Sequence, residues 1–530
     1  MDPGNTSPRA TRGRIVMLVD NGVHGDSRVQ KTARSAAAAG WDVVLLGILG
    51  ATGGPDTWSI GDATVRLVRV PRPLGQHPTQ FHRSLRRPLA YPPGRHAGYR
   101  VQRMKAWQAD IAERRTAAAV RRGGSLSQRV GGLLLTPAQL TARALGLWTR
   151  FRAGELRRLH KHQQNPDALL TRASIRFWQR LLGPRSWRRL DRGLWDYELA
   201  FGPVIDELRP DIIHANDFRM IGVGVRATRR ARARGRNTRL VWDAHEFVAG
   251  VLGRADNPRW LPAQIAHVEE YVGAADAVVT VSATLAELLQ RTHRLPVRPE
   301  VVLNAPPRPV VDPADGSLDV RARCGVGPTT PLLVYCGGVN PSRGVDLMID
   351  ALAHLTDVHV ALVTLHPTAN NAASEALRAR AAAAGVADRV HLLPYVPHWQ
   401  VAAFLASADA GVIPIHHKPN HELALITKFL EYSHARLPIV VSDVRTMAET
   451  VRETGQGEVF RAEDVADYVR AVRAVLADPG RYRAAYDRPG LLESWTWEAQ
   501  AEVLEGVYRR LRPDLSVSPG DRAAVAAVSG

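Results

Sequence analysis

Two segments in the second half of the sequence carry charged side chains in a pattern that suits anion binding, and the first of them is also rich in glycine. Segment 337–344 (GGVNPSRG) follows an apolar run and leads toward a helix, so its backbone N–H groups can face an anion and Arg343 adds charge. Segment 427–432 (TKFLEY) can begin a helix that carries Lys428 and Glu431 on one face. The structural alternatives are a plain strand-to-helix turn and a surface Lys–Glu pair.

Three further segments place polar residues directly after apolar runs in the first half of the chain. Segment 20–28 (DNGVHGDSR) contains two glycines that allow tight turns, segment 242–246 is WDAHE, and Asn216-Asp217 ends a neighbouring run. Polar side chains at such points face a ligand cleft in an α/β protein. The alternatives are a glycine-containing turn for the first segment, and a helix N-cap with a surface histidine for the second.

The elements that must position these segments are alternating strands and helices. Continuous Val/Ile/Leu runs separated by helical segments predict parallel sheets covered on both faces. In such sheets ligands bind at the carboxyl ends of the strands. We predict strands at 14–20, 42–48, 64–70, 211–215, 239–243, 277–281, 300–304, 332–336, 358–364, 390–393, 411–415 and 439–442, and a helix from Asp26 to Ala39.

The pattern predicts an α/β protein with two Rossmann-like, doubly wound domains that face a cleft. The expected parts are an N-terminal domain at 14–304 with a basic, mostly helical insertion at about 75–200, a Pro/Asp/Gly-rich linker at 305–330, a C-terminal domain at 331–496, a closing helix at 497–512 and a disordered tail at 513–530.

Composition excludes several classes of protein. The 530 residues have ordinary apolar and charged fractions, so collagen-like, coiled-coil and wholly disordered chains are excluded. No apolar run is long enough to span a membrane, and the polar start lacks the apolar centre of a secretory signal. The two cysteines are too few for a disulfide framework or a zinc site, so we expect a reducing cytosol.

One motif is a decoy. Segment 222–227 (GVGVRA) fits the spacing of a dinucleotide-binding fingerprint, with Asp243 about twenty residues further on. Residues 217–221, however, separate its first glycine from the preceding strand, whereas the fingerprint needs that glycine at the turn. We therefore do not expect NAD to bind here.

Several segments occur in an order that resembles a known family. They are DSRVQK (26–31), WDAHE (242–246), ADAVVTVS (275–282), the glycine loop ending in Arg343-Gly344, TKFLEY (427–432) with LPIV (437–440), and SWTW (494–497). Over residues 14–70 and 200–512 the sequence resembles the retaining glycosyltransferases of family 4. That resemblance implies the two-domain GT-B fold and transfer of a sugar from a nucleoside diphosphate donor, UDP- or GDP-linked.

The resemblance also implies roles for individual residues. His245, flanked by Asp243 and Glu246, would lie at the reaction centre against the transferred sugar. Arg343 and Lys428 would neutralise the donor diphosphate, and Glu431 would bind the ribose. The implied donor-binding set is Gly337, Gly338, Arg343, Gly344, Leu425, Thr427, Lys428 and Glu431, and the implied acceptor-side loop contains Gly22, Gly25, Asp26 and Arg28. Fixed cations and helix N-termini can stabilise the leaving diphosphate, and the sequence has no Asp-x-Asp, so we expect no metal and no cofactor.

Three positions depart from the family pattern. Glu422 precedes Glu431 by nine positions where many members have eight, Gly338 stands where many members have a basic residue, and Arg436 stands where a glycine is usual.

The net charge of +19 is concentrated in residues 81–195, which hold 25 Lys and Arg against 5 Asp and Glu. An anionic membrane surface is the first candidate partner for this block, and an ordinary helix with a solvated arginine face is the alternative. Nucleic acid is not expected. The segment that suggests a membrane contact is 172–182, in which Ile175, Trp178, Leu181 and Leu182 share one helical face and Arg172, Arg176 and Arg180 flank another.

We therefore predict a bacterial, cytoplasmic glycosyltransferase, peripheral on the inner face of the plasma membrane, with a glycan or lipid-linked acceptor in cell-envelope or glycoconjugate synthesis. The alternatives are a nucleotide-sugar epimerase of the same fold and a non-catalytic, membrane-associated adaptor.

Overall fold

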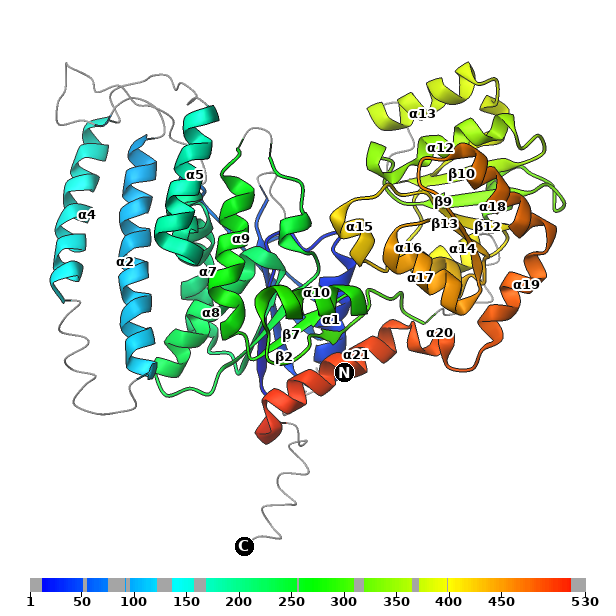
Figure 1. Cartoon of the computed structure of the whole chain (residues 1–530). Helices are drawn as coiled ribbons and strands as arrows, with labels where there is room; N and C mark the ends of the chain where they lie inside the picture. Colours follow the sequence, from blue (N-terminus) through cyan, green and yellow to red (C-terminus); the bar gives the residue numbers. More distant parts are fainter. Residues whose placement is uncertain are drawn as a thin grey trace, which may run out of the picture. The chain divides into compact units, whose positions relative to one another are not determined.

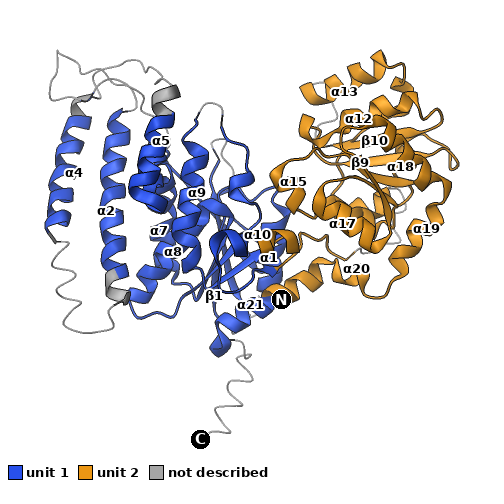
Figure 2. Ribbon diagram, viewed as in Figure 1, with its two compact units in different colours: residues 1–279, 289–300, 505–530 blue, residues 280–288, 301–504 orange. Residues whose placement is uncertain are grey.

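The structure is a computed structural model and describes residues 12–50, 55–74, 91, 96–121, 136–156, 168–254, 257–308, 319–364, 371–397 and 399–515. The chain forms two compact units (Figure 2): unit 1 comprises Met1–Val279, Leu289–Glu300 and Glu505–Gly530, and unit 2 comprises Thr280–Leu288 and Val301–Leu504. The predicted tail from 516 onward and linker residues 309–318 lie outside the described residues.

Unit 1 is built on a sheet with the strand order β3-β4-β2-β1-β5-β6-β7-β8. Strands β1 to β6 pair in parallel except for the antiparallel hairpin β3–β4. The strands are β1 Arg14–Leu18, β2 Asp42–Ile48, β3 Thr57–Ile60, β4 Ala63–Val68, β5 Ile212–Asn216, β6 Arg239–Ala244, β7 Ala277–Thr280 and β8 Glu300–Val301. Each predicted strand in this half of the chain is therefore present, and β3 is an addition.

Unit 2 has an all-parallel sheet with the order β11-β10-β9-β12-β13-β14. Alternate residues of β9 enter opposite cores: Leu332 and Val334 pack in one apolar cluster, and Leu333 and Tyr335 pack in the other. The sheet is therefore covered on both faces, as its apolar runs predict. The strands are β9 Leu332–Cys336, β10 His359–Thr364, β11 Val390–Pro394, β12 Ala410–Ile413, β13 Ile439–Ser442 and β14 Gly457–Phe460.

Helices connect the strands (Figure 1). In the first half they are α1 Ser27–Ala38, α2 His96–Arg121, α4 Thr136–Leu156, α5 Ala168–Leu182, α6 Trp187–Leu190, α7 Leu194–Leu208, α8 Asp217–Ala233, α9 Trp260–Tyr271 and α10 Ala283–His293. In the second half they are α11 Val320–Cys324, α12 Val345–Asp350, α13 Ala372–Ala383, α14 Val401–Leu405, α15 Pro419–Leu423, α16 Thr427–His434, α17 Arg445–Thr454, α18 Val465–Ala477, α19 Pro479–Ala484, α20 Leu491–Ser494 and α21 Trp497–Leu511. None of the helices in the described ranges is both long and apolar enough to cross a bilayer.

The last part of the predicted linker differs from expectation, because residues 320–324 form helix α11 within unit 2. Asp319 caps this helix, and Arg321 donates hydrogen bonds to Ser407 O and Thr330 O and pairs with Asp409 at 2.7 Å. A helix of five residues is too short to leave an apolar period in the sequence.

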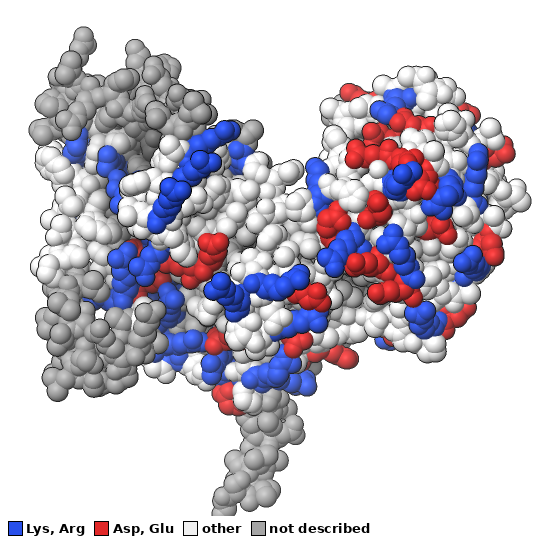
Figure 3. Space-filling model, viewed as in Figure 1, with Lys and Arg blue, Asp and Glu red and all other residues white. Residues whose placement is uncertain are grey.

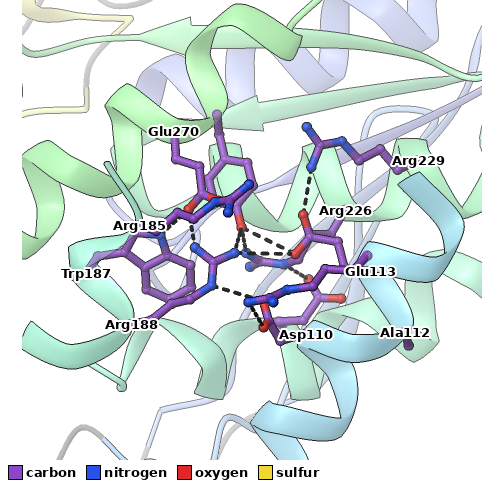
Figure 4. Close-up of polar contacts among 12 residues, drawn as sticks. Asp110, Ala112, Glu113, Arg185, Trp187, Arg188, Arg226, Arg229 and Glu270 are labelled. Atoms are coloured by element: carbon purple, nitrogen blue, oxygen red, sulfur yellow. Dashed lines mark hydrogen bonds and ion pairs between the residues drawn. The ribbon is translucent and has the colours of Figure 1, made fainter. Parts of the chain in front are cut away.

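Buried charges fasten the insertion to unit 1. Arg188 pairs with Asp110 of α2 at 3.0 Å and with Glu270 of α9, while Arg229 of α8 pairs with Glu113 of α2 at 2.7 Å (Figure 4). Removing one member of such a network leaves a buried charge without its partner and is strongly destabilising. Helix α2 is therefore a firm part of unit 1.

The predicted apolar face of α5 does not pack as one surface. Ile175 is buried and Trp178 is half-buried under the guanidinium of Arg189, which lies 5.1 Å from the ring centroid, but Leu181 is 60% exposed. Arg172, Arg176 and Arg180 are all exposed, which both a membrane contact and a solvated arginine face predict.

Candidate active site

His245 follows strand β6 and lies between two carboxylates. Its Nε2 atom is 3.3 Å from Oδ2 of Asp243, and its Nδ1 atom is 3.6 Å from Oδ1 of Asp217. Burial opposes a charge on the ring, but the two carboxylates outweigh it and raise the pKa of His245 to about 9. The histidine is therefore an imidazolium at neutral pH and offers a positive charge at the carboxyl edge of the sheet.

Asp217 is the first residue of α8 and adopts a left-handed backbone, with φ of 64°. This conformation is unfavourable for a residue with a side chain, and it turns the carboxylate toward His245. Burial raises the pKa of Asp217 to about 6, against the opposing effect of His245. Asp217 is thus an anion at neutral pH, held in place by strained backbone.

Asp243 lies behind His245 and is only 1% exposed. Both of its oxygens accept hydrogen bonds of 3.0 Å from the guanidinium of Arg28 in α1, and its Oδ2 is 3.5 Å from Nε2 of His214. The Nδ1 atom of His214 is in turn 2.7 Å from the hydroxyl of Tyr508 in α21. Asp243 and Arg28 are therefore positioning residues for His245, and Asp243 is not the helix cap of the structural alternative.

The predicted acceptor-side loop connects β1 to α1. Asn21 orders it by donating from Nδ2 to Asp26 at 2.8 Å and accepting from the backbone N–H of Val23 at 2.7 Å, while Asp26 caps α1. Gly22 lies within this turn, and Gly25 has a φ of 82° that favours glycine. Glu246 is exposed, beyond His245.

In unit 2, the glycine loop after β9 is shaped around Lys428. Gly337 has a φ of 142°, and a Cβ atom at this position would lie 2.6 Å from Nζ of Lys428. Gly344 has a φ of 63°, and a Cβ atom there would lie 2.0 Å from the carbonyl oxygen of Pro414. Both positions therefore require glycine, whereas a Cβ at Gly338 would meet open space.

Lys428 and Arg343 form a pair of neighbouring cations. Nζ of Lys428 lies 4.8 Å from the ring centroid of Tyr335, and neither cation has an ion-pair partner among the residues that the structure describes. Burial and the charge of Arg343 lower the pKa of Lys428 to about 8. Two like charges that stay close, with no carboxylate within ion-pair distance of either in the described part of the chain, are suited to bind an anion with more than one negative oxygen.

Glu431 lies three residues after Lys428 on α16, and its side chain is 7% exposed. Thr427 begins this helix, as predicted, and Leu425 precedes it as a buried residue. The first turn of α16 points unpaired N–H groups and the positive end of its dipole toward the same region. The structure thus brings the predicted donor-side residues of unit 2 together at the carboxyl end of its sheet.

The structure also accounts for two of the sequence departures. Glu422 accepts hydrogen bonds from the backbone N–H of Arg445 at 2.7 Å and from His417 at 2.5 Å, so it caps α17. Arg436 adopts the left-handed conformation with φ of 54°, so the turn that a glycine would make is retained.

The dinucleotide-fingerprint decoy lies inside helix α8. A Cβ atom at Gly222 would lie 2.2 Å from Nε2 of His267, and one at Gly224 would lie 2.7 Å from Leu240. These glycines serve close packing of α8, which confirms that the motif is not a nucleotide-binding turn.

Comparison with known proteins identifies the family. The model of Glycosyltransferase Family 4 matches residues 147–305, and that of Glycosyl transferases group 1 matches residues 330–478, together more than half of the chain. The chain belongs to the family 4 glycosyltransferases. As a member of this family it is an enzyme of the transferase class, and its relatives named below are bacterial.

A D-inositol 3-phosphate glycosyltransferase of Streptomyces bingchenggensis is 27% identical over 325 residues, which cover 57% of this chain and 68% of that protein. The sucrose-phosphate synthase of Thermosynechococcus elongatus superposes with a TM-score of 0.58 at 16% identity, covering 95% of this chain and all of that one. Anabaena HepE, solved in complex with UDP-glucose, superposes with a TM-score of 0.52 at 12% identity, covering 94% of this chain and 99% of that one. These similarities confirm the GT-B fold.

Sequence reasoning did not assign four residues that the structure places at the site. Asp217 carried a weak signal, because it follows a strand as Asp243 does. His214 and Tyr508 gave none, since Tyr508 lies 294 positions after the histidine that it contacts. The ring of Tyr335 lies under Lys428. No feature of the sequence indicated this, because Tyr335 is one of five consecutive buried residues in β9.

Proposed function

We propose that the chain transfers a sugar from a nucleoside diphosphate donor to an acceptor hydroxyl with retention of configuration. The observation that carries this proposal is the pair Lys428 and Arg343, two neighbouring cations that have no carboxylate within ion-pair distance among the described residues. A diphosphate matches them in charge and in the number of its oxygens. HepE, which shares the fold, was solved with UDP-glucose, so UDP-sugars are the first donors to test.

The leaving diphosphate gains negative charge as the glycosidic bond breaks. Lys428, Arg343 and the start of α16 are fixed before the reaction, so they stabilise that charge without reorganising. We propose that these groups supply the positive charge that a metal ion supplies in other transferases. In the part of the chain that the structure describes, no three His, Cys, Asp or Glu side chains are grouped as metal ligands would be.

His245 is proposed to act on the sugar as an imidazolium. With carboxylates near both ring nitrogens it cannot serve as a free base, whereas its positive charge and its ring N–H groups can orient a sugar hydroxyl or attract developing negative charge. Asp217 and Asp243 would keep it charged and oriented. Glu431 is proposed to accept hydrogen bonds from the ribose hydroxyls, and the loop at 20–26 is proposed to face the acceptor. The buried Arg28, predicted as part of this loop, lies in α1 and binds Asp243 instead.

The proposed acceptor is a glycan or a lipid-linked molecule of cell-envelope or glycoconjugate synthesis, used at the cytoplasmic side of the membrane. The relative from Streptomyces is named for inositol 3-phosphate, so a phosphorylated polyol is a further acceptor to include.

The decisive experiment is a donor screen followed by product analysis. UDP- and GDP-sugars are first tested for thermal stabilisation, since a ligand at about one hundred times Kd adds ~2.7 kcal/mol to the free energy of unfolding. NMR of the product from an α-linked donor should then show an α linkage and free nucleotide. An inverted product would refute retention, and isomerised donor without free nucleotide would indicate an epimerase.

His245→Ala tests the reaction centre. It should reduce kcat strongly and change the Kd of the donor little, because the proposed diphosphate contacts lie in unit 2. Normal turnover in this variant would show that His245 has only a structural role between its two carboxylates.

A further inference from the structure

Helix α4 of the insertion packs its small residues inward. Ala142 and Thr149 are 0% and 5% exposed. Gly146 lies so close to α2 that a Cβ atom there would be 3.1 Å from Nε2 of Gln108. The residues that face α2 thus recur every three or four positions, as in any packed helix, but none of them is large.

The large apolar residues of α4 face the opposite way. Leu140, Leu147, Trp148 and Phe151 are 60%, 63%, 47% and 52% exposed, and their spacing of seven, eight and eleven residues places them on one stripe. The rings of Trp148 and Phe151 stack with centroids 5.6 Å apart. A helix that packs on one side normally buries its large apolar residues there. In α4 this arrangement is inverted, because the small residues face α2 and the large apolar ones face solvent. In Figure 3 the flank of unit 1 over α4 is largely white, with some blue and grey at its margins.

The charges beside this stripe have one sign. Arg143 and Arg150 are exposed, and at 100° per residue both lie along one border of the stripe. Arg152 lies on the other side, with its guanidinium 4.4 Å from the centroid of the Tyr91 ring. Among the α4 side chains that the structure describes, 137–153, every charged one is an arginine.

The stripe is held on a firm base. Gln108 of α2 donates to the carbonyl oxygen of Ala142 at 3.0 Å, and Arg115 of α2 donates to Gln139 at 2.5 Å. Helix α2 itself is fastened to α8 and α9 by the charge network of Figure 4. The exposed side chains of α4 therefore project from a helix that is already ordered.

We propose that the outer face of α4 docks on an anionic lipid bilayer, with the helix in the plane of the membrane. Leu140, Leu147, Trp148 and Phe151 would enter the boundary between headgroups and acyl chains, while Arg143 and Arg150 would meet lipid phosphates. At 21 residues the helix is about 30 Å long, enough to contact several lipids along its length.

The charges favour this occupant over two others. A second copy of the chain would bring the arginine borders of two helices together, and they would repel. A nucleic acid would leave the apolar centre of the stripe without a partner. An anionic bilayer matches both parts of the surface. Docking would also hold the enzyme near a lipid-linked acceptor, a consequence that rests on the proposed function, whereas the docking itself does not.

The test is sedimentation of the full chain with phosphatidylcholine vesicles, with and without about one third phosphatidylglycerol. The chain should bind the anionic vesicles, bind the neutral ones at least about tenfold more weakly, and be released by high salt as the Debye length falls to ~3 Å. Trp148→Gln with Phe151→Ser should weaken binding at least about tenfold, and Arg143→Gln with Arg150→Gln should weaken it by a similar factor.

Matched controls use exposed residues of unit 1 that lie outside α4. Leu252→Ser with Val297→Ser removes two apolar side chains that are 70% and 74% exposed, and Arg34→Gln with Arg291→Gln removes two exposed charges. Both controls should bind vesicles as the unmodified chain does. Nucleotide binding, measured on the same samples, should be equal in all variants, which separates failure of docking from failure of the proposed function.

Three results of the binding assays would overturn the proposal. They are no binding of the unmodified chain to anionic vesicles at low salt, undiminished binding in the Trp148 and Phe151 variant, and a self-association that this variant abolishes. Hydrogen exchange of the unmodified chain provides a readout that needs no variant, because vesicles should slow exchange in α4. Exchange in α4 that is unchanged by vesicles would equally refute the docking.

Discussion

Lys428 titrates near neutral pH, so donor binding should be linked to proton uptake. Burial and Arg343 lower its pKa to about 8 in the unliganded protein. A diphosphate placed against the ammonium favours the charged form, so this pKa must rise on binding. Binding should therefore take up roughly a tenth of a proton at about pH 7, roughly half at about pH 8 and roughly nine tenths at about pH 9.

The same linkage sets the affinity. The binding-competent, charged form predominates below about pH 8, so Kd should be nearly constant there. It should rise by about tenfold between about pH 7 and about pH 9, a loss of ~1.4 kcal/mol of binding free energy. The direction follows from the sign of the shift, because a lysine that must gain a proton binds less well when protons are scarce.

Isothermal titration calorimetry with UDP-glucose measures both quantities. Titrations at about pH 8 in two buffers of different ionisation enthalpy give the proton uptake directly. Lys428→Arg is the matched control, because a guanidinium stays charged throughout this range and any titration of the donor itself appears in both proteins. Equal proton uptake by the two proteins, or a Kd that does not rise toward pH 9, would refute the assignment of Lys428 to the diphosphate.

Three further predictions concern single residues. Asp217→Asn removes one carboxylate from the surroundings of His245, so the pKa of His245 should fall and the alkaline loss of kcat should move to lower pH. If the alkaline side of the pH profile of kcat does not move, Asp217 does not position the ring. Glu431→Ala should weaken donor binding by ~1.5–3 kcal/mol, tenfold or more by calorimetry, while the fold stays intact by circular dichroism; unchanged affinity would remove Glu431 from the donor site. Arg436→Gly should raise the free energy of unfolding in urea by about 1 kcal/mol, since glycine tolerates the φ of 54°; a lower value would show that its exposed ion pair with Asp487 matters more than the backbone.

The parts of the fold that could be predicted are those with a long, unbroken signal. Strands such as β1 and β9 are runs of Val, Ile and Leu bounded by turns. Strand β3 was not predicted. It has only four residues, and as an antiparallel strand at the edge of the sheet it alternates exposed with half-buried side chains instead of forming a continuous apolar run. Strand β14 was not predicted for a similar reason, since only Phe460 among its residues is fully buried.

At the site, sequence indicated the residues whose role depends on local spacing and failed for those whose role depends on tertiary contact. Lys428 and Glu431 share a helix face, so their proximity follows from the sequence alone. The network behind His245 joins α1, β5, β6, α8 and α21, and no local pattern announces such a meeting. The inversion of α4 was hidden for the same reason, because periodicity shows that a helix is amphipathic but not which side its neighbour covers.

The hydrogen bond between His214 and Tyr508 has a consequence for biosynthesis. The ribosome produces β1, β5 and β6 long before it reaches α21, so a nascent chain can form most of this sheet while His214 still lacks its hydroxyl partner. The proposed reaction centre is then completed only when helix α21 packs beside β5. A polypeptide cut short before that helix would resemble the full chain in its sheets yet lack the hydroxyl that binds His214.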